Sequence, residues 1–204
     1  PVVTFQDAPS APDADVTETP ELALQERLEL GYADAQHVMG RRYETGDGVA
    51  VDPVLAADYY FKAASQGYAQ AQSDLGRFYA EGIGIRQDIS LAFDWFLQAA
   101  EQDLADAQFN VALILQRGDL GEAKPDVAAD WYWRAAAQGH DDAIVNLSNM
   151  YLDGDGIDQN PTYAYELLRD AAEQGNPAGQ LNLARLLVQS GYQAPSTHDV
   201  RGLL

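Results

Sequence analysis

The sequence contains no cysteine, few basic residues and no long apolar run. The absence of cysteine excludes disulfides, thiolate metal sites and cysteine nucleophiles. Only 12 Lys and Arg stand against 32 Asp and Glu, which gives a formal net charge of -20 at pH 7. This charge opposes binding to nucleic acid, which needs a cationic surface, and docking on anionic lipid. No apolar run approaches the roughly 20 residues that span a bilayer, so no direct membrane insertion is expected.

The acidity fits either a basic surface on a partner protein or solubility alone. The chain starts at Pro1 rather than Met, which indicates that an upstream segment was removed by processing or by design of the expressed chain. If that segment was a signal peptide, the protein is exported, and a periplasmic location is expected. Otherwise the protein is cytoplasmic, and the sequence leaves both locations open.

What the sequence does contain is a 36-residue repeat without an insertion. Residues 69–104 align with 33–68, 105–140 and 141–176, and a repeat of this length determines the architecture. The predicted organisation is a flexible acidic Pro/Ala-rich arm at 1–18, a solenoid at 19–191 and a tail at 192–204. The solenoid divides into a half repeat at 19–32, full repeats at 33–68, 69–104, 105–140 and 141–176, and a partial repeat at 177–191.

Each full repeat has the pattern of two antiparallel helices joined by a glycine turn. In the first copy, small or apolar residues at Ala35, Met39 and Gly40 follow the spacing of a helical stripe. The second helix is expected to begin at Asp52-Pro53, where an acid precedes a proline at the first helical position. With the half repeat included, the pattern predicts about nine helices.

Equivalent positions in the copies keep the same character. A small column predicts a close helix crossing, and a bulky column predicts a filler between successive helix pairs. The small column is Gly40, Gly76, Ala112, Ser148 and Ala184, and the bulky column is Tyr59, Trp95 and Trp131.

This pattern resembles the Sel1-like repeat, a relative of the tetratricopeptide repeat. The residues that carry the resemblance in the second copy are Ala71, Leu75, Gly76, Tyr79, Gly82, Gly84, Ile85, Asp88, Ala92, Trp95, Phe96, Ala99 and Ala100. The resemblance implies an all-α, right-handed α-α superhelical solenoid whose concave face, lined by the first helices, binds other proteins. It also implies that the protein acts as an adaptor or scaffold rather than as a catalyst, so neither enzymatic activity nor a cofactor is expected.

Local motifs that suggest chemistry have simpler explanations. Gly82-Ile83-Gly84 lacks the third glycine and the preceding strand of a phosphate-binding loop, which favours an inter-helix turn. The acidic stretch after Asp153 departs from a calcium loop at its fifth and sixth positions, Ile157 and Asp158. The three histidines show neither the spacing of a helical metal site nor a Ser-His-Asp grouping. The sequence therefore predicts neither a metal site nor catalytic residues.

Residues flanking the small column on the first helices are predicted to face the concave groove. The candidate protein-binding residues are His37, Arg41, Arg77, Phe109, Leu113, Val145, Asn149, Leu152, Leu181 and Arg185. This stripe passes from charged to largely apolar, and an exposed apolar patch is typical of a peptide-binding surface. The alternative is that Phe109, Leu113 and Val145 pack against neighbouring first helices.

The sequence favours a non-catalytic scaffold or adaptor that binds a partner protein or peptide in the concave groove. One alternative is an accessory structural subunit of a larger, membrane-embedded assembly, such as a bacterial envelope or respiratory complex. A third hypothesis is a hydrolase built on the repeats. This hypothesis needs a polar pocket with a perturbed acid or base, which no motif in the sequence indicates.

Overall fold

The computed structural model describes residues 20–189, which form ten helices and no strand. The predicted arm at 1–18 and the predicted tail at 192–204 lie outside the described residues. The expected number of about nine helices is too low, because the partial fifth repeat contributes a complete 13-residue helix. The helices are α1 (Pro20–Glu29), α2 (Ala33–Thr45), α3 (Pro53–Ala64), α4 (Ala69–Glu81), α5 (Ile89–Ala100), α6 (Ala105–Arg117), α7 (Pro125–Ala137), α8 (Asp141–Asp153), α9 (Pro161–Glu173) and α10 (Pro177–Gln189).

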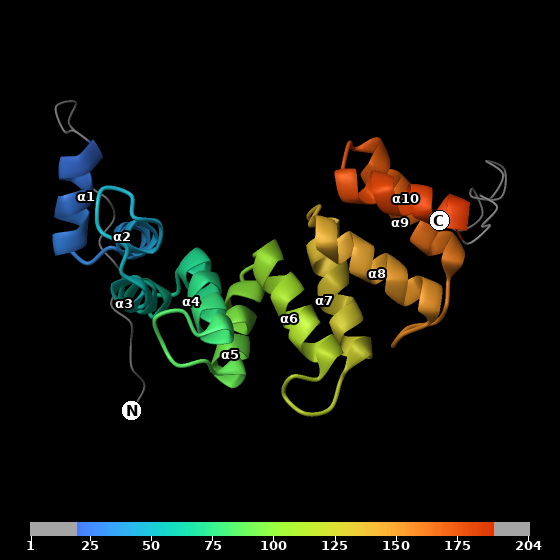
Figure 1. The fold of residues 1–204 in the computed structure, drawn as a ribbon, viewed down its shortest axis with the longest axis horizontal. Helices are drawn as coiled ribbons and strands as arrows, with labels where there is room; N and C mark the ends of the chain where they lie inside the picture. Colours follow the sequence, from blue (N-terminus) through green and yellow to red (C-terminus); the bar gives the residue numbers. More distant parts are fainter. Residues whose placement is uncertain (1–19, 190–204) are drawn as a thin grey trace.

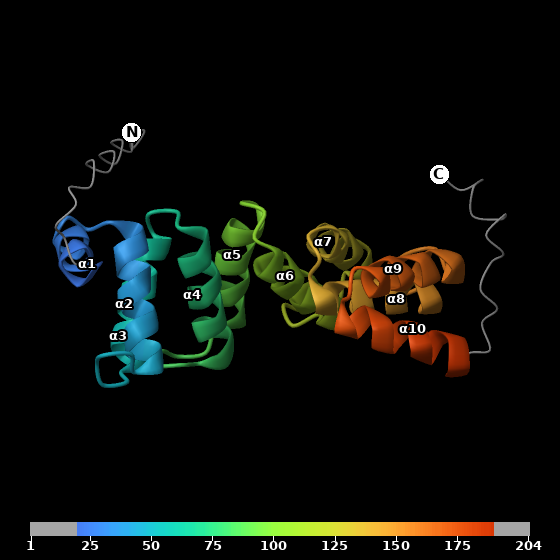
Figure 2. The same cartoon turned by 90° about the horizontal axis from the view of Figure 1, so that it is seen from above.

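The helices stack in sequence order into a curved arc (Figure 1). The first helix of each repeat packs on the second, and the second helix packs on the first helix of the next repeat. Seen from above, α1 and α10 lie at opposite ends of the elongated molecule (Figure 2). The chain is therefore a solenoid in which contacts are made between neighbouring helices along the sequence.

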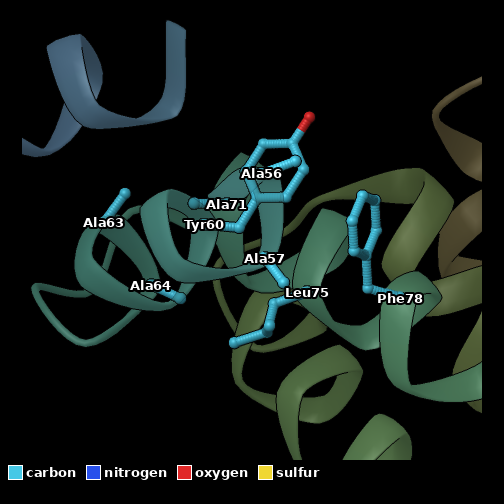
Figure 3. Close-up of a cluster of buried hydrophobic side chains, with 8 residues drawn as sticks. All are labelled: Ala56, Ala57, Tyr60, Ala63, Ala64, Ala71, Leu75 and Phe78. Carbon is cyan, nitrogen blue, oxygen red and sulfur yellow. The ribbon is translucent and has the colours of Figure 1, made fainter. Parts of the chain in front are cut away.

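Close helix crossings inside the repeats depend on glycine facing an aromatic ring. A Cβ atom on Gly40 would lie 2.7 Å from the ring of Tyr60, and one on Gly76 would lie 2.8 Å from the ring of Phe96. Tyr60 is fully buried in a cluster of alanines from α3 and α4, with Leu75 and Phe78 beside it (Figure 3). A larger residue at either glycine would push the two helices apart.

The side chains that fill these crossings are the residues one place after the predicted bulky column. Tyr59, Trp95 and Trp131 are only partly buried. The buried residues are Tyr60, Phe96, Tyr132 and Leu168. Trp95 packs against the cluster of α3 and α4, and Trp131 packs against the cluster of α5 and α6, so these two residues lie between successive helix pairs as predicted.

Side-chain caps begin most of the second helices, as the acid-proline pattern indicated. Asp52 accepts hydrogen bonds from the backbone N–H groups of Val54 and Leu55 at the start of α3. Asp88 caps α5 and Asn160 caps α9 in the same way. Lys124 occupies this position before α7 and makes no side-chain cap within the described chain. The third repeat thus begins its second helix without the stabilisation that a cap gives.

The second glycine of the inter-helix turn allows close contact between repeats. Gly84 has a φ of +66°, and a Cβ there would lie 2.3 Å from the carbonyl oxygen of Pro53 in the preceding repeat. Gly156 lies against Pro125 in the same way. The third copy has Leu120 at this position, and its side chain is 47% exposed. The turn of the third repeat therefore directs this side chain to solvent.

The fifth copy differs at its predicted crossing position. Ala184 is exposed on α10, whereas the equivalent Ser148 on α8 is buried. Among the described residues, α10 packs on α9 and α8, and no second helix of its own repeat covers Ala184. A residue of the small column is therefore buried at a helix crossing only where the second helix of the same repeat is among the described residues.

Candidate protein-binding face

The first helices of repeats one and two enclose a polar pocket, here called the N-terminal pocket. Its volume is about 400 Å³. Helices α2 and α4 supply most of its lining, with Tyr60 from α3 and Asp106 from α6. The lining residues are His37, Arg41, Glu44, Thr45, Tyr60, Gln70, Ser73, Asp74, Arg77, Leu104 and Asp106.

A network of charged and polar groups connects the two repeats across this pocket. His37 Nε2 lies 2.8 Å from Asp74 Oδ2, and the His37 ring is 9% exposed between Tyr60 and Tyr68. The Arg77 guanidinium donates to Glu44 Oε1 over 2.6 Å and lies 3.5 Å from Asp74 Oδ1. The His37–Asp74 and Arg77–Glu44 pairs each join different repeats, so the network fixes α2 and α4 relative to each other.

The environment keeps two groups of this network in their donor forms. Burial, and then the hydrogen bond to Glu44, raises the pKa of Tyr60 above its ordinary value. For Arg77, burial lowers the pKa, but the hydrogen bond and charge of Glu44 outweigh it and raise the pKa overall. The phenol therefore stays protonated and the guanidinium stays charged at neutral pH, so both donate hydrogen bonds and neither acts as a base.

A second pocket, here called the C-terminal pocket, lies between α8, α9 and α10. Its volume is about 260 Å³. Half of its lining residues are aliphatic, and the other half, Ser148, Asn149, Asn182 and Arg185, are polar. The lining residues are Val145, Ser148, Asn149, Leu152, Leu168, Asn182, Arg185 and Leu186. A pocket of this composition suits an apolar side chain that carries a polar group beside it.

The two pockets collect most of the residues predicted for the groove. The N-terminal pocket contains His37, Arg41 and Arg77, and the C-terminal pocket contains Val145, Asn149, Leu152 and Arg185. The remaining predicted residues, Phe109, Leu113 and Leu181, line neither of these pockets.

The three remaining residues have different surroundings. Phe109 is partly buried and stacks on His140 with ring centroids 4.6 Å apart. It also packs against the core cluster around Tyr132. Leu113 is partly buried, whereas Leu181 is 62% exposed on α10. Phe109 therefore packs against Tyr132 of α7 and against His140 at the start of α8.

Several pocket residues were not among the predicted candidates, and Tyr60 is the most informative. Tyr60 lies on a second helix, whereas all the predicted groove residues come from first helices. A signal was nevertheless present, because Tyr60 follows Glu44 by 16 residues and Tyr132 follows Gln116 by the same spacing. Tyr132 donates to Gln116 over 3.0 Å, as Tyr60 does to Glu44 over 2.5 Å. In repeats two and four, the phenol is absent and the acceptor is replaced by Ala80 or Leu152.

A glutamine column between repeats was also missed. Gln72 Nε2 donates to the carbonyl of Ala64, and Gln72 Oε1 accepts from Gln102 Nε2 over 2.7 Å. Gln108 makes the equivalent bonds to Ala100 and Gln138. Gln72 and Gln108 are almost fully buried, so these bonds satisfy polar groups at the helix ends. Their 36-residue spacing was visible in the sequence.

Within residues 20–189, no three His, Asp or Glu side chains converge on a position that could hold a metal ion. The same part of the chain has no helix that is long and apolar enough to cross a membrane.

Comparison with known proteins assigns the family. The model of the Sel1 repeat matches residues 33–68, 69–104, 105–140 and 141–176. The chain belongs to the Sel1 repeat family. The fold of this family is generally a non-catalytic scaffold, and Sel1 repeat proteins typically mediate protein-protein interactions. A search of curated proteins found no significant match.

Solved structures of other Sel1 repeat proteins share the fold. A Sel1 repeat protein from Oxalobacter formigenes is 30% identical with a TM-score of 0.74, over 90% of this chain and 73% of that one. A protective antigen of uropathogenic Escherichia coli with an SLR fold is 33% identical with a TM-score of 0.72. That match covers 78% of this chain but only 34% of the antigen, so this Sel1 chain spans about a third of it. The predicted all-α superhelix is confirmed.

Proposed function

We propose that this Sel1 repeat chain is a non-catalytic scaffold that holds a segment of a partner protein on its first-helix face. The observation that supports the proposal is the concentration of predicted groove residues in two pockets, one at each end of that face. Both pockets can be reached from solvent, because each is lined by an exposed residue. This residue is Arg41 in the N-terminal pocket and Asn149 in the C-terminal pocket.

The two pockets differ in chemistry, which would orient the partner. The N-terminal pocket presents the carboxylates of Glu44 and Asp74 together with guanidinium groups, and so favours a polar or charged segment. The C-terminal pocket has walls of Val145, Leu152 and other aliphatic residues, and so favours an apolar side chain. A segment that enters both pockets would bind in one direction only.

The test is purification of the chain under native conditions with whatever it binds in its own cells. The groove variant carries Arg41→Glu and Asn149→Arg, both at exposed positions that line the pockets. A matched control carries Arg86→Glu and Ser90→Arg, exposed positions that line neither pocket. Because the charge changes are identical, the two variants differ only in location.

The expected result is a stoichiometric partner that is retained by the control and lost by the groove variant while the variant stays helical. Retention of the partner by both variants would contradict the groove as the binding face. If the wild-type chain instead loses solubility when it is separated from its partner, it is a permanent subunit of a larger assembly rather than an adaptor.

A further inference from the structure

The second helices carry exposed apolar side chains at equivalent positions of the repeat. Leu55 of α3, Leu91 of α5 and Val127 of α7 are 39%, 41% and 39% exposed, each one period from the next. Six residues later on two of these helices, Phe61 is 48% and Trp133 is 52% exposed. These side chains lie away from both pockets of the first-helix face.

An acidic row runs between these apolar positions. Asp58, Asp94 and Asp130 are all exposed and each lies three residues after the first apolar position of its helix. Positions three apart in a helix differ by about 60° around its axis, so each acid has apolar neighbours on both sides. Asp58 pairs with Lys62 over 2.6 Å, whereas Asp94 and Asp130 make no ion pair with any described residue.

One ring contact joins the apolar side chains of two neighbouring second helices. The ring of Phe61 on α3 meets the ring of Trp95 on α5 edge-on, with centroids 6.2 Å apart. This contact places the exposed Phe61 of α3 beside the partly exposed Trp95 of α5. An extended apolar surface on a soluble protein is typical of an interaction site, whereas scattered apolar residues are not.

We propose that this second-helix face docks a basic amphipathic helix of a partner protein. A helix with lysine or arginine between two apolar stripes places cations against Asp94 and Asp130 and apolar groups against Leu91 and Val127. A second copy of this chain is a poor occupant, because both faces would present the same acidic row and the chain carries a net charge of -20. Anionic lipid is opposed by the same charge.

The test uses a fluorescein-labelled synthetic helix of about 20 residues, with a lysine stripe between two leucine stripes and with capped ends. A second probe replaces every lysine with glutamate. Binding to the full chain is measured by fluorescence anisotropy. The face is altered in two ways, by Asp94→Lys with Asp130→Lys and by Leu91→Ser with Val127→Ser. The matched control is Asp119→Lys with Glu122→Lys, two exposed acids in the turn of the third repeat.

The lysine probe is expected to bind the wild-type chain, and the glutamate probe is not. Each altered face is expected to weaken binding by about tenfold or more, while the control stays within about twofold of wild type. Arg41→Glu with Asn149→Arg should leave this affinity unchanged, so this inference and the groove proposal can fail separately.

Three results would overturn the inference. The first is an equal loss in the Asp119→Lys, Glu122→Lys control, which would indicate attraction to overall charge. The second is unchanged binding after Leu91→Ser with Val127→Ser, or no binding of the lysine probe at all. The third is a dimer in sedimentation, or binding to phosphatidylglycerol vesicles, that the same leucine and valine substitutions abolish. Either would assign the face to another occupant.

Discussion

The Tyr60 hydroxyl donates a hydrogen bond to Glu44 Oε2 over 2.5 Å and thereby joins the two helices of the first repeat beside the N-terminal pocket. The other oxygen of Glu44 accepts from Arg77 of the second repeat. One carboxylate thus connects a helix crossing to the neighbouring repeat. The third repeat has a neutral version of the same arrangement, in which Tyr132 donates to Gln116.

Tyr60→Phe should therefore destabilise the chain by about 1.5–3 kcal/mol, the range typical of a hydrogen bond to a charged acceptor. Tyr132→Phe removes two neutral bonds, the one donated to Gln116 and the one accepted from Asn146, each of about 0.5–1.5 kcal/mol, so its total loss should be similar. Urea unfolding followed by circular dichroism measures both. A loss below about 0.5 kcal/mol for Tyr60→Phe would show that the charge of Glu44 does not strengthen the crossing.

Above pH 10.0, the free energy of unfolding should fall more steeply with pH than the titration of surface groups alone explains. Burial, and then the hydrogen bond to Glu44, raises the pKa of Tyr60 above its ordinary value of 10.0. Below pH 10.0 the phenol is protonated in both states and its contribution is intact; above it, the unfolded chain loses the proton more readily, so stability falls with rising pH. The unfolding midpoint of Tyr60→Phe should fall less steeply above pH 10.0 than that of wild type. Parallel curves would contradict this assignment.

Gly84→Ala should cost more stability than Gly48→Ala. Both glycines have positive φ, at +66° and +72°, so both substitutions carry a similar backbone strain of about 1–2 kcal/mol. Only at Gly84 would the new Cβ also meet the backbone of Pro53, since nothing lies within 4 Å of a Cβ on Gly48. The difference between the two thermal midpoints measures the contact between repeats, and identical midpoints would mean that the turn moves freely.

Asp103→Gly should stabilise the chain. Asp103 has a φ of 62° at the end of the second repeat, where the equivalent residues Gly67 and Gly139 have φ of 86° and 83°. Relief of this strain should raise the free energy of unfolding by about 0.5–1 kcal/mol. The reverse change, Gly139→Asp, is the matched control and should lower it. Asp103 Oδ1 accepts a hydrogen bond from Gln108 Nε2 over 3.4 Å, and destabilisation by Asp103→Gly would show that this bond outweighs the strain.

The repeat made the fold predictable because each helix boundary appears in several equivalent positions. Asp52 before Pro53 indicated a capped helix start, and the equivalent residues Asp88 and Asn160 cap α5 and α9. The crossing at Gly40 was predictable because a small residue recurs there. The fifth copy departs at Ala184, since burial of that position depends on a following helix and not on α10 itself.

The candidate sites were less predictable because they form between repeats. The contact of His37 with Asp74 joins residues 37 positions apart, and a stripe drawn within one helix cannot contain it. The bulky column lies between helix pairs at Trp95 and Trp131 as predicted, but it does not include Tyr60, which fills the crossing with Gly40. Arg185 reaches the C-terminal pocket as expected, while Leu168 and Asn182 join it from outside the predicted set.

The central claim is that a partner segment occupies the first-helix face of this Sel1 repeat chain. Hydrogen–deuterium exchange of the purified complex against the free chain tests it most directly. The account predicts slower exchange at α2 and α4 beside the N-terminal pocket and at α8 and α10 beside the C-terminal pocket. Unchanged exchange at all four helices, with protection confined to α3, α5 and α7, would contradict it.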